Sequence, residues 1–173
     1  MSTDATRTTR RTFLRGAGAG ALAYTVGGAT VLLTPREARA RAVPLQVLTE
    51  AQATTLEAFA GVLVEGAADA GVVHFVDQQL ALDPNDALLT ARYFNVEPPF
   101  AAFYAAGLAA LDGAAQAAHG KPFGELPAGA AQALAGGLLG GNPPGWQGPP
   151  APVVYLVMRS DAVDVVYGTP RGF

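Results

Sequence analysis

Two histidines, His74 and His119, are the only imidazole side chains in the 173-residue chain. His74 stands three residues before Asp77 in the stretch VVHFVD, a spacing that places both side chains on one side of a helix. Imidazole and carboxylate groups both ligate metals, but two ligands are too few for a zinc or non-haem iron site, and no third candidate is close in sequence. We interpret His74 as a core or interface residue that donates to a carbonyl. Metal binding by His74, Asp77 and nearby acids is the alternative.

The other reactive side chains also lack the partners that known sites require. His119 precedes Gly120 at an expected helix end, where a partial positive charge is favourable without catalysis. Asp83 and Asp86 lie near Asp77, but the stretch DQQLALDPND lacks the alternating ligands and closing glutamate of a calcium loop.

No nucleophile or phosphate-binding motif is evident either. Ser2 and Ser160 are the only serines, cysteine is absent, and neither a G-x-S-x-G elbow nor a P-loop occurs. Residues 16–21 fit G-x-G-x-x-A, but no strand precedes them and no βαβ unit surrounds them. The sequence therefore predicts no catalytic, cofactor-binding or metal-binding residue in this chain.

The elements that carry these residues read as helices. Thr49 and Gln52 form a capping box ahead of apolar residues at helical spacing. The pattern predicts five helices: residues 49–64, a segment around 72–80, a segment starting at the Asp-Pro pair 83–84, residues 100–119, and one starting near Pro127. The last segment, from residue 153, suits strands by its β-branched content and a helix by its length, so the pattern leaves it open.

A Gly/Pro-rich linker at residues 140–152 separates this last segment from the rest. The fold class we expect is all-α, a small bundle of five or six helices with this linker and a C-terminal segment that packs on a partner.

The N-terminus has the three-part layout of an export signal. Arg10 and Arg11, followed by Phe13 and Leu14, resemble the twin-arginine class, which a receptor reads. An uncharged stretch, residues 16–34, leads to overlapping Ala-x-Ala cleavage sites that end at Ala40 and Ala42. As a helix this stretch would be about 28 Å long, so an uncleaved anchor is the alternative, although its glycines make it a poor one.

We therefore divide the chain into an export signal, residues 1–42, and a single helical domain, residues 43–173. The domain keeps four basic residues against twelve acidic ones, a net charge of −8 that argues against nucleic acid or anionic lipid as a partner. Without cysteine it has no disulfides, which small exported domains often use, so it must be stable through packing or through a partner.

The domain resembles the gluconate 2-dehydrogenase subunit 3 family over about residues 45–173. The resemblance is distributed, and its most specific pieces are GAADAGVVHFVD, HGKPFGEL and DAVDVVYGTPRGF. It implies that the last segment is helical. It also implies a non-catalytic small subunit that binds, stabilises and co-exports a flavoprotein to the periplasm.

The expected partner is the large subunit of a dehydrogenase of the glucose-methanol-choline type, which binds FAD and oxidises a sugar, sugar acid or alcohol. Many complexes of the family add a multihaem cytochrome c, so haem c is expected, if at all, in a third subunit. The twin-arginine translocase would be a partner during export. The alternative, from another class, is a free-standing periplasmic protein that binds a metal or a solute.

For the partner interface we select aromatic residues of the C-terminal third together with one arginine, because interfaces favour these types. The residues are Trp146, Tyr155, Arg159, Tyr167 and Phe173. Tyr155 and Tyr167 could equally be core residues. Trp146 is preferred because its Gly and Pro neighbours are not expected to build a core around it.

Overall fold

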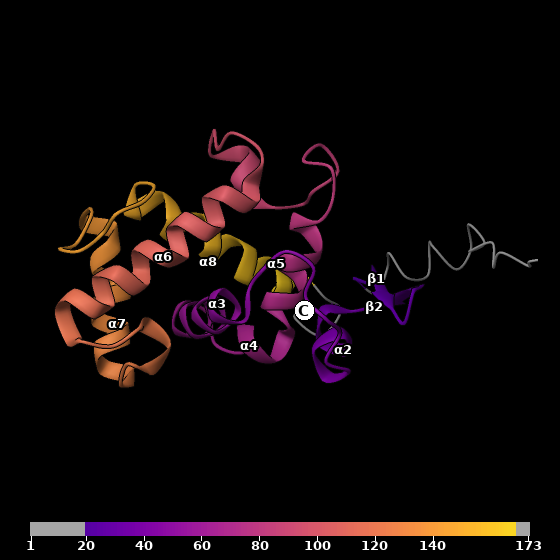
Figure 1. Ribbon diagram of the computed structural model, residues 1–173, viewed down its shortest axis with the longest axis horizontal. Coiled ribbons are helices and arrows are strands. Elements are labelled where there is room, and N and C mark those ends of the chain that lie inside the picture. The colour runs from indigo at the N-terminus through magenta and orange to yellow at the C-terminus, as the bar shows by residue number, and fades with distance from the viewer. Residues whose placement is uncertain (1–19, 169–173) are drawn as a thin grey trace, which may run out of the picture.

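The computed structural model describes residues 20–168, and these form a predominantly helical domain, which confirms the expected fold class (Figure 1). The longer helices are α3 (Glu50–Leu63), α5 (Val72–Leu80), α6 (Phe100–His119), α7 (Ala128–Gly137) and α8 (Ala151–Tyr167). The shorter elements are β1 (Leu22–Val26), β2 (Ala29–Leu33), α2 (Pro35–Ala40), α4 (Ala67–Ala70) and the 3₁₀ turns η1 (Thr90–Tyr93), η2 (Phe123–Glu125) and η3 (Leu138–Gly140).

One large hydrophobic core lies between α3, α5, α6 and α8. Phe59 of α3, Tyr104 of α6 and Met158 of α8 are among its fully buried side chains. Phe123 of η2 packs edge-on against Phe59, with 5.5 Å between ring centroids. The C-terminal helix α8 is therefore part of the domain's own core, whereas the sequence predicted that this segment packs on a partner.

Local sequence signals explain most of the helix limits. Thr49 and Gln52 form both hydrogen bonds of the predicted capping box at the start of α3. Gly120 has a left-handed conformation (φ 71°) and ends α6, as predicted. The last segment is the helix α8, which agrees with the family resemblance and settles the choice that the pattern left open.

One predicted helix is wrong. The Asp-Pro start at residues 83–84 leads into a turn, and only η1 follows before α6. The Asp83 carboxylate accepts a hydrogen bond from the backbone N–H of Asn85 (2.9 Å), which closes an Asx-type turn in place of a helix cap.

The residues before α3 form a small unit beside α5. Strands β1 and β2 pair antiparallel through a tight turn at Gly27 and Gly28, with Leu22 opposite Leu33. A second, small core under this hairpin and α2 consists of Tyr24, Leu33, Ala38 and Val43. Residues 20–34 thus contain two strands where the anchor alternative requires a helix. Among residues 20–168 no helix is both long and apolar enough to span a membrane.

Candidate functional site: an exposed apolar loop and a pocket at Arg39

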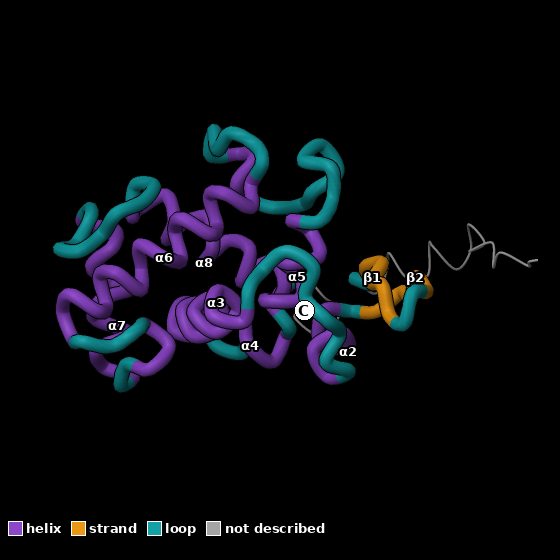
Figure 2. The backbone as a smooth tube through the Cα atoms, in the orientation of Figure 1, coloured by secondary structure: helices purple, strands orange, loops and turns teal. Residues whose placement is uncertain are grey.

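The segment that joins α5 to α6, residues 81–99, projects beyond the helices at the top edge of the molecule (Figure 2). It exposes large apolar side chains to solvent: the exposed fraction is 60% for Leu88, 77% for Tyr93 and 37% for Phe94. Leu82 is exposed at the start of the same segment. We call residues 82–94 the presenting loop. Exposed aromatic and aliphatic side chains that gather in one segment indicate an interaction surface.

Buried residues alternate with the exposed ones and fix the presenting loop. Ala87, Leu89 and Ala91 are fully buried in the main core. Leu88 lies between two of these anchors, Ala87 and Leu89, and its own side chain is held in solvent. The loop is therefore packed against the domain rather than free of it.

Side chains from the helices and from the loop itself also hold its backbone. Gln79 of α5 accepts a hydrogen bond from Leu88 N–H through Oε1 (2.6 Å). The Arg92 guanidinium donates to the carbonyl of Ala87 (2.9 Å) and lies over the ring of Tyr93, 5.6 Å from its centroid. These contacts hold the loop backbone while its apolar side chains remain exposed.

The most deeply buried residue that holds the presenting loop is Asp161 of α8. Its Oδ1 accepts from Thr90 N–H (2.9 Å), and its Oδ2 accepts from the Tyr104 hydroxyl in a short hydrogen bond. Burial raises the pKa of Asp161 to about 6, against the hydrogen bonds from Tyr104 and Thr90, which lower it. Burial, and then the charge of Asp161, raise the pKa of Tyr104, which stays a donor.

Two further carboxylates hold loops in the same manner. Asp77 of α5 accepts from the backbone N–H groups of residues 46, 47 and 48 at 2.8–2.9 Å. Asp112 of α6 accepts from Phe123 N–H (2.9 Å) and from the Thr55 hydroxyl (2.9 Å). Asp77 thus has a structural role, because both of its carboxylate oxygens accept from the backbone that precedes α3.

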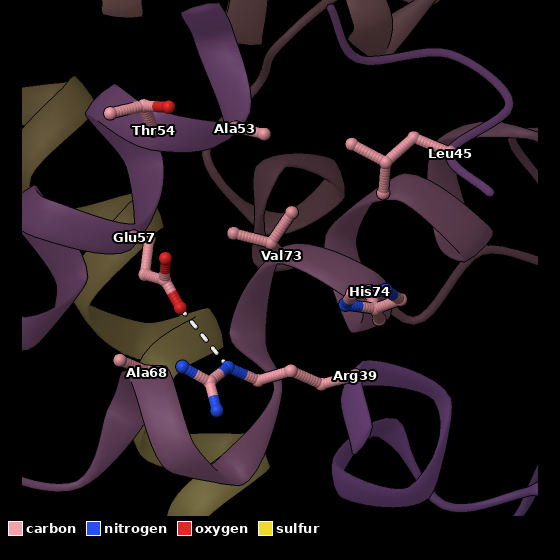
Figure 3. A pocket seen from close by; sticks show the side chains of 8 residues that line it. All are labelled: Arg39, Leu45, Ala53, Thr54, Glu57, Ala68, Val73 and His74. Atoms are coloured by element: carbon pink, nitrogen blue, oxygen red, sulfur yellow. Dashed lines mark hydrogen bonds and ion pairs between the residues drawn. The ribbon is translucent and has the colours of Figure 1, made fainter. Parts of the chain in front are cut away.

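A second candidate site is a pocket of about 370 Å³ between α2, α3, α4 and α5 (Figure 3). Arg39 crosses it and pairs with Glu57 (Nε–Oε1 3.1 Å) and more distantly with Asp69 (3.7 Å). The other lining residues are mostly small or apolar: Leu45, Ala53, Thr54, Ala68, Val73 and His74. Its size suits a small solute.

His74 lies at one wall of this pocket, where Nε2 is 3.2 Å from the carbonyl of Val43. Because a carbonyl only accepts, Nε2 carries the hydrogen, as predicted for a histidine that donates to a carbonyl. Nδ1 is buried and has no hydrogen-bond partner among the described residues. The pKa of His74 is lowered, chiefly by burial, so the ring is neutral near pH 7. Within residues 20–168 no three His, Cys, Asp or Glu side chains gather as a metal site would require.

The interface residues expected from the sequence all lie C-terminal to the presenting loop, between residues 146 and 173. Tyr155 is half-buried and packs edge-on against Phe59 (6.5 Å between centroids), whereas Arg159 and Tyr167 are exposed on α8. Phe173 lies outside the described residues, as do the signal residues Arg10, Arg11, Phe13 and Leu14.

Trp146 has a core built around it, contrary to the expectation from its Gly and Pro neighbours. Trp146 belongs to the main core, with 8% of its surface exposed, and its indole N–H donates to the carbonyl of Pro149 (2.7 Å). Gly145 and Gly148 let the linker backbone lie directly on α6, and this close approach closes a core around the indole. Trp146 therefore has little free surface for a partner.

The sequence did not reveal that Leu88, Tyr93 and Phe94 are exposed. Residues 87–94, ALLTARYF, also fit a helix whose apolar face is buried. The signal that could have found them was the Asp83–Asn85 turn pair, which favours a loop and therefore exposed side chains.

The fold and these sites define a small helical protein that holds its loops with buried carboxylates and exposes apolar residues of one loop to solvent. The chain belongs to the gluconate 2-dehydrogenase subunit 3 family, whose model matches residues 50–173. The family name implies assembly into a larger dehydrogenase complex. No curated protein and no solved structure matches the chain.

Proposed function

We propose that this chain is the non-catalytic small subunit of a periplasmic FAD-dependent dehydrogenase of the glucose-methanol-choline type, and that it binds, stabilises and escorts the catalytic flavoprotein. The presenting loop is the observation that supports this most directly. Four large apolar side chains there are exposed, while Gln79, Arg92 and Asp161 hold the backbone beneath them.

Such a surface suits a permanent partner. Tyr93 and Phe94 supply large apolar area, and the Arg92 guanidinium over the Tyr93 ring adds a cation beside it. Aromatic side chains and arginine are enriched at the centres of protein interfaces. The loop loses little conformational entropy on binding because its hydrogen bonds are already formed in the free subunit.

Introducing a charge among the apolar contacts tests this surface. The chain is co-expressed with its catalytic flavoprotein, and the variants Leu88→Asp and Tyr93→Asp are compared with the natural chain by co-purification and by the Kd of the complex. Each is expected to weaken binding at least about 30-fold, since central apolar contacts contribute about 2 kcal/mol or more.

Leu139→Asp is the matched control, because Leu139 is 51% exposed in η3, outside the presenting loop. It should leave the Kd within about threefold, as surface substitutions outside an interface do. Equal binding by all three variants, each with an unchanged helical spectrum, would exclude the presenting loop as the interface.

Export through the twin-arginine route is the second part of the proposal. Arg10 and Arg11 stand ahead of the Ala-x-Ala sites that end at Ala40 and Ala42. Arg10→Lys with Arg11→Lys is expected to leave both this chain and its flavoprotein in the cytoplasm, as cell fractionation would show. Normal export of the flavoprotein beside a retained small subunit would refute the escort role.

The cofactors belong to the partners in this proposal, with FAD in the large subunit and haem c in a cytochrome subunit where one is present. Flavin absorbance and dehydrogenase activity should therefore follow the large subunit during purification. Stoichiometric flavin on the small subunit alone would contradict this assignment.

A free-standing solute- or metal-binding protein is the competing proposal, and the pocket at Arg39 and Glu57 is the observation in its favour. Elemental analysis and native mass spectrometry of the purified chain distinguish the two. A stoichiometric metal or small molecule that is lost in Glu57→Gln would favour the pocket.

A further inference from the structure

Helix α2 and the turn after it dock on the domain at one specific place. The backbone of Pro35, at the start of α2, lies directly on Gly71, the junction of α4 and α5 (φ 86°). A Cβ at Gly71 would overlap the Pro35 carbonyl and would stand 2.8 Å from Arg36 N. Only glycine permits this contact, because real Cβ atoms do not approach backbone so closely and the positive φ also favours glycine.

Two further contacts attach the docked segment to the domain, and a third stabilises its helix. The His74 ring donates to the carbonyl of Val43 (3.2 Å) at its C-terminal end. Arg39 reaches across the pocket to Glu57 of α3 (Figure 3). Thr34 and Glu37 close a complete capping box on α2. We call residues 34–43 the clasp.

The hairpin before the clasp is attached to the same part of the domain. The Tyr24 hydroxyl donates to the backbone carbonyl of His74 (3.2 Å), and the Tyr24 side chain is buried beside Ala38 in the small core. The clasp is therefore covered by the hairpin on one side and lies on α5 on the other.

The clasp contains both candidate cleavage sites in folded form. Ala38, the first alanine of the Ala38-x-Ala40 motif, is fully buried. Val43 N–H donates to Ala38 O (3.0 Å), and Ala42 N–H donates to Arg39 O (3.0 Å) with Ala42 in a left-handed conformation (φ 48°). The backbone N–H groups of residues 41–43, which flank both scissile bonds, are therefore already paired within the clasp.

We propose that the clasp is a docked cover that hides the Ala-x-Ala sites from signal peptidase, so that cleavage occurs only from molecules in which the clasp has opened. The proposal rests on the export route proposed above. The clasp is docked in the folded chain, so a chain that is exported in its folded state meets the peptidase with the clasp closed.

The covalent step is ordinary hydrolysis. The peptidase adds water across the Ala40–Arg41 or Ala42–Val43 peptide bond, which frees a carboxylate on the leader and an amino group on the domain. When opening and closing are faster than cleavage, the rate follows the fraction of molecules that are open. Docking therefore sets how much of the exported chain keeps its clasp.

Limited proteolysis of the purified full chain tests docking without any export. The clasp contains three trypsin sites, at Arg36, Arg39 and Arg41. Gly71→Ala is expected to speed cleavage at these sites at least about tenfold, because the added methyl displaces Pro35 and raises the open fraction.

Gly66→Ala is the matched control. Gly66 has nearly the same left-handed conformation (φ 81°), but a Cβ there meets nothing within 4 Å. It carries similar backbone strain without the clash, so its cleavage should stay within about threefold of the natural chain. Equal acceleration in both variants would overturn the clasp as the cause.

Leu33→Ser is a second test of clasp docking, made in the hairpin that precedes the clasp. Leu33 belongs to the small core with Tyr24 and Ala38, outside the main core, so the domain should keep its helical spectrum. Trypsin cleavage in the clasp should again rise at least about tenfold. An unchanged rate in both Leu33→Ser and Gly71→Ala would refute the proposal.

Intact mass of the exported chain extends the test to cells. The natural chain should retain residues 35–43, whereas Gly71→Ala should be cut after Ala40 or Ala42. Complete cleavage of the natural chain would refute the clasp as a cover. Failure of the natural chain to be exported would refute the proposed export function. The trypsin experiment would then still show whether the clasp is docked.

Discussion

At the scale of single residues, three acidic side chains have a role that the net charge does not show. Asp77, Asp112 and Asp161 each stand on a helix and accept hydrogen bonds from the backbone N–H groups of a loop. Hydrogen bonds to a charged acceptor contribute more than neutral ones, and removing a buried acceptor leaves its donors unpaired. These carboxylates therefore position segments that connect the longer helices.

Asp161 gives the clearest prediction because its pKa is raised to about 6 by burial. Between the ordinary value of 3.8 and about 6, the folded chain keeps a proton that the unfolded chain has released. The contribution of Asp161 to the free energy of unfolding is thus highest at low pH and is lost as the pH rises through 6. Asp161→Asn, which stays neutral, should remove this loss.

Urea unfolding of both proteins at several pH values, from about 4 to about 7.5, measures the effect. The advantage of Asp161→Asn over the natural chain should grow across this range by up to about 3 kcal/mol, the equivalent of a shift of about two pKa units. Asp164, whose pKa burial also raises, is present in both proteins and cancels. A constant difference across the range would contradict the assignment.

At the scale of elements, close backbone contacts decide how the Gly/Pro-rich linker lies. A Cβ at Gly148 would stand 2.8 Å from Ala110 Cβ and 2.9 Å from Ala106 O of α6. The linker therefore lies directly on α6 and brings Trp146 into the core. Its glycines were expected to make it a separator, but here they permit packing.

Gly148→Ala should accordingly destabilise the protein by about 1–3 kcal/mol, as overpacking against backbone does. Gly129→Ala is the opposite case, because Gly129 lies in α7 and a Cβ there meets nothing within 4 Å. It should stabilise by about 0.5–1 kcal/mol, the difference in helix propensity. Thermal unfolding measures both, and equal effects would show that contact with α6 is unimportant.

Elements with local signals could be predicted from the sequence. The capping box at Thr49, the left-handed Gly120 and the apolar period of α3 and α6 all depend on neighbours within a few residues. The presenting loop was missed because its anchors, Leu89 and Thr90, are held by the core and by Asp161, which is 71 residues from Thr90. Contacts at such separation leave no periodic trace in the sequence.

At the scale of the whole molecule, the described residues build two cores of unequal size. The main core draws its buried residues from Leu48 to Val165, and the small core consists of Tyr24, Leu33, Ala38 and Val43. The small unit contacts the domain chiefly between α2 and α5. The division between residues 42 and 43 that the cleavage motif suggests thus falls close to the boundary between the cores.

A chain that begins at residue 43 should therefore fold by itself. It keeps the complete main core and the loop attachments of Asp77, Asp112 and Asp161, and it loses the hairpin and α2. We expect a cooperative thermal transition with a Tm lowered by about 5–10 °C, the equivalent of a loss of about 2 kcal/mol. Binding to the flavoprotein should be unchanged, because the presenting loop is anchored entirely in the main core. A non-cooperative or absent transition would show that the hairpin and the clasp are an integral part of the fold, which the mature protein must then always retain.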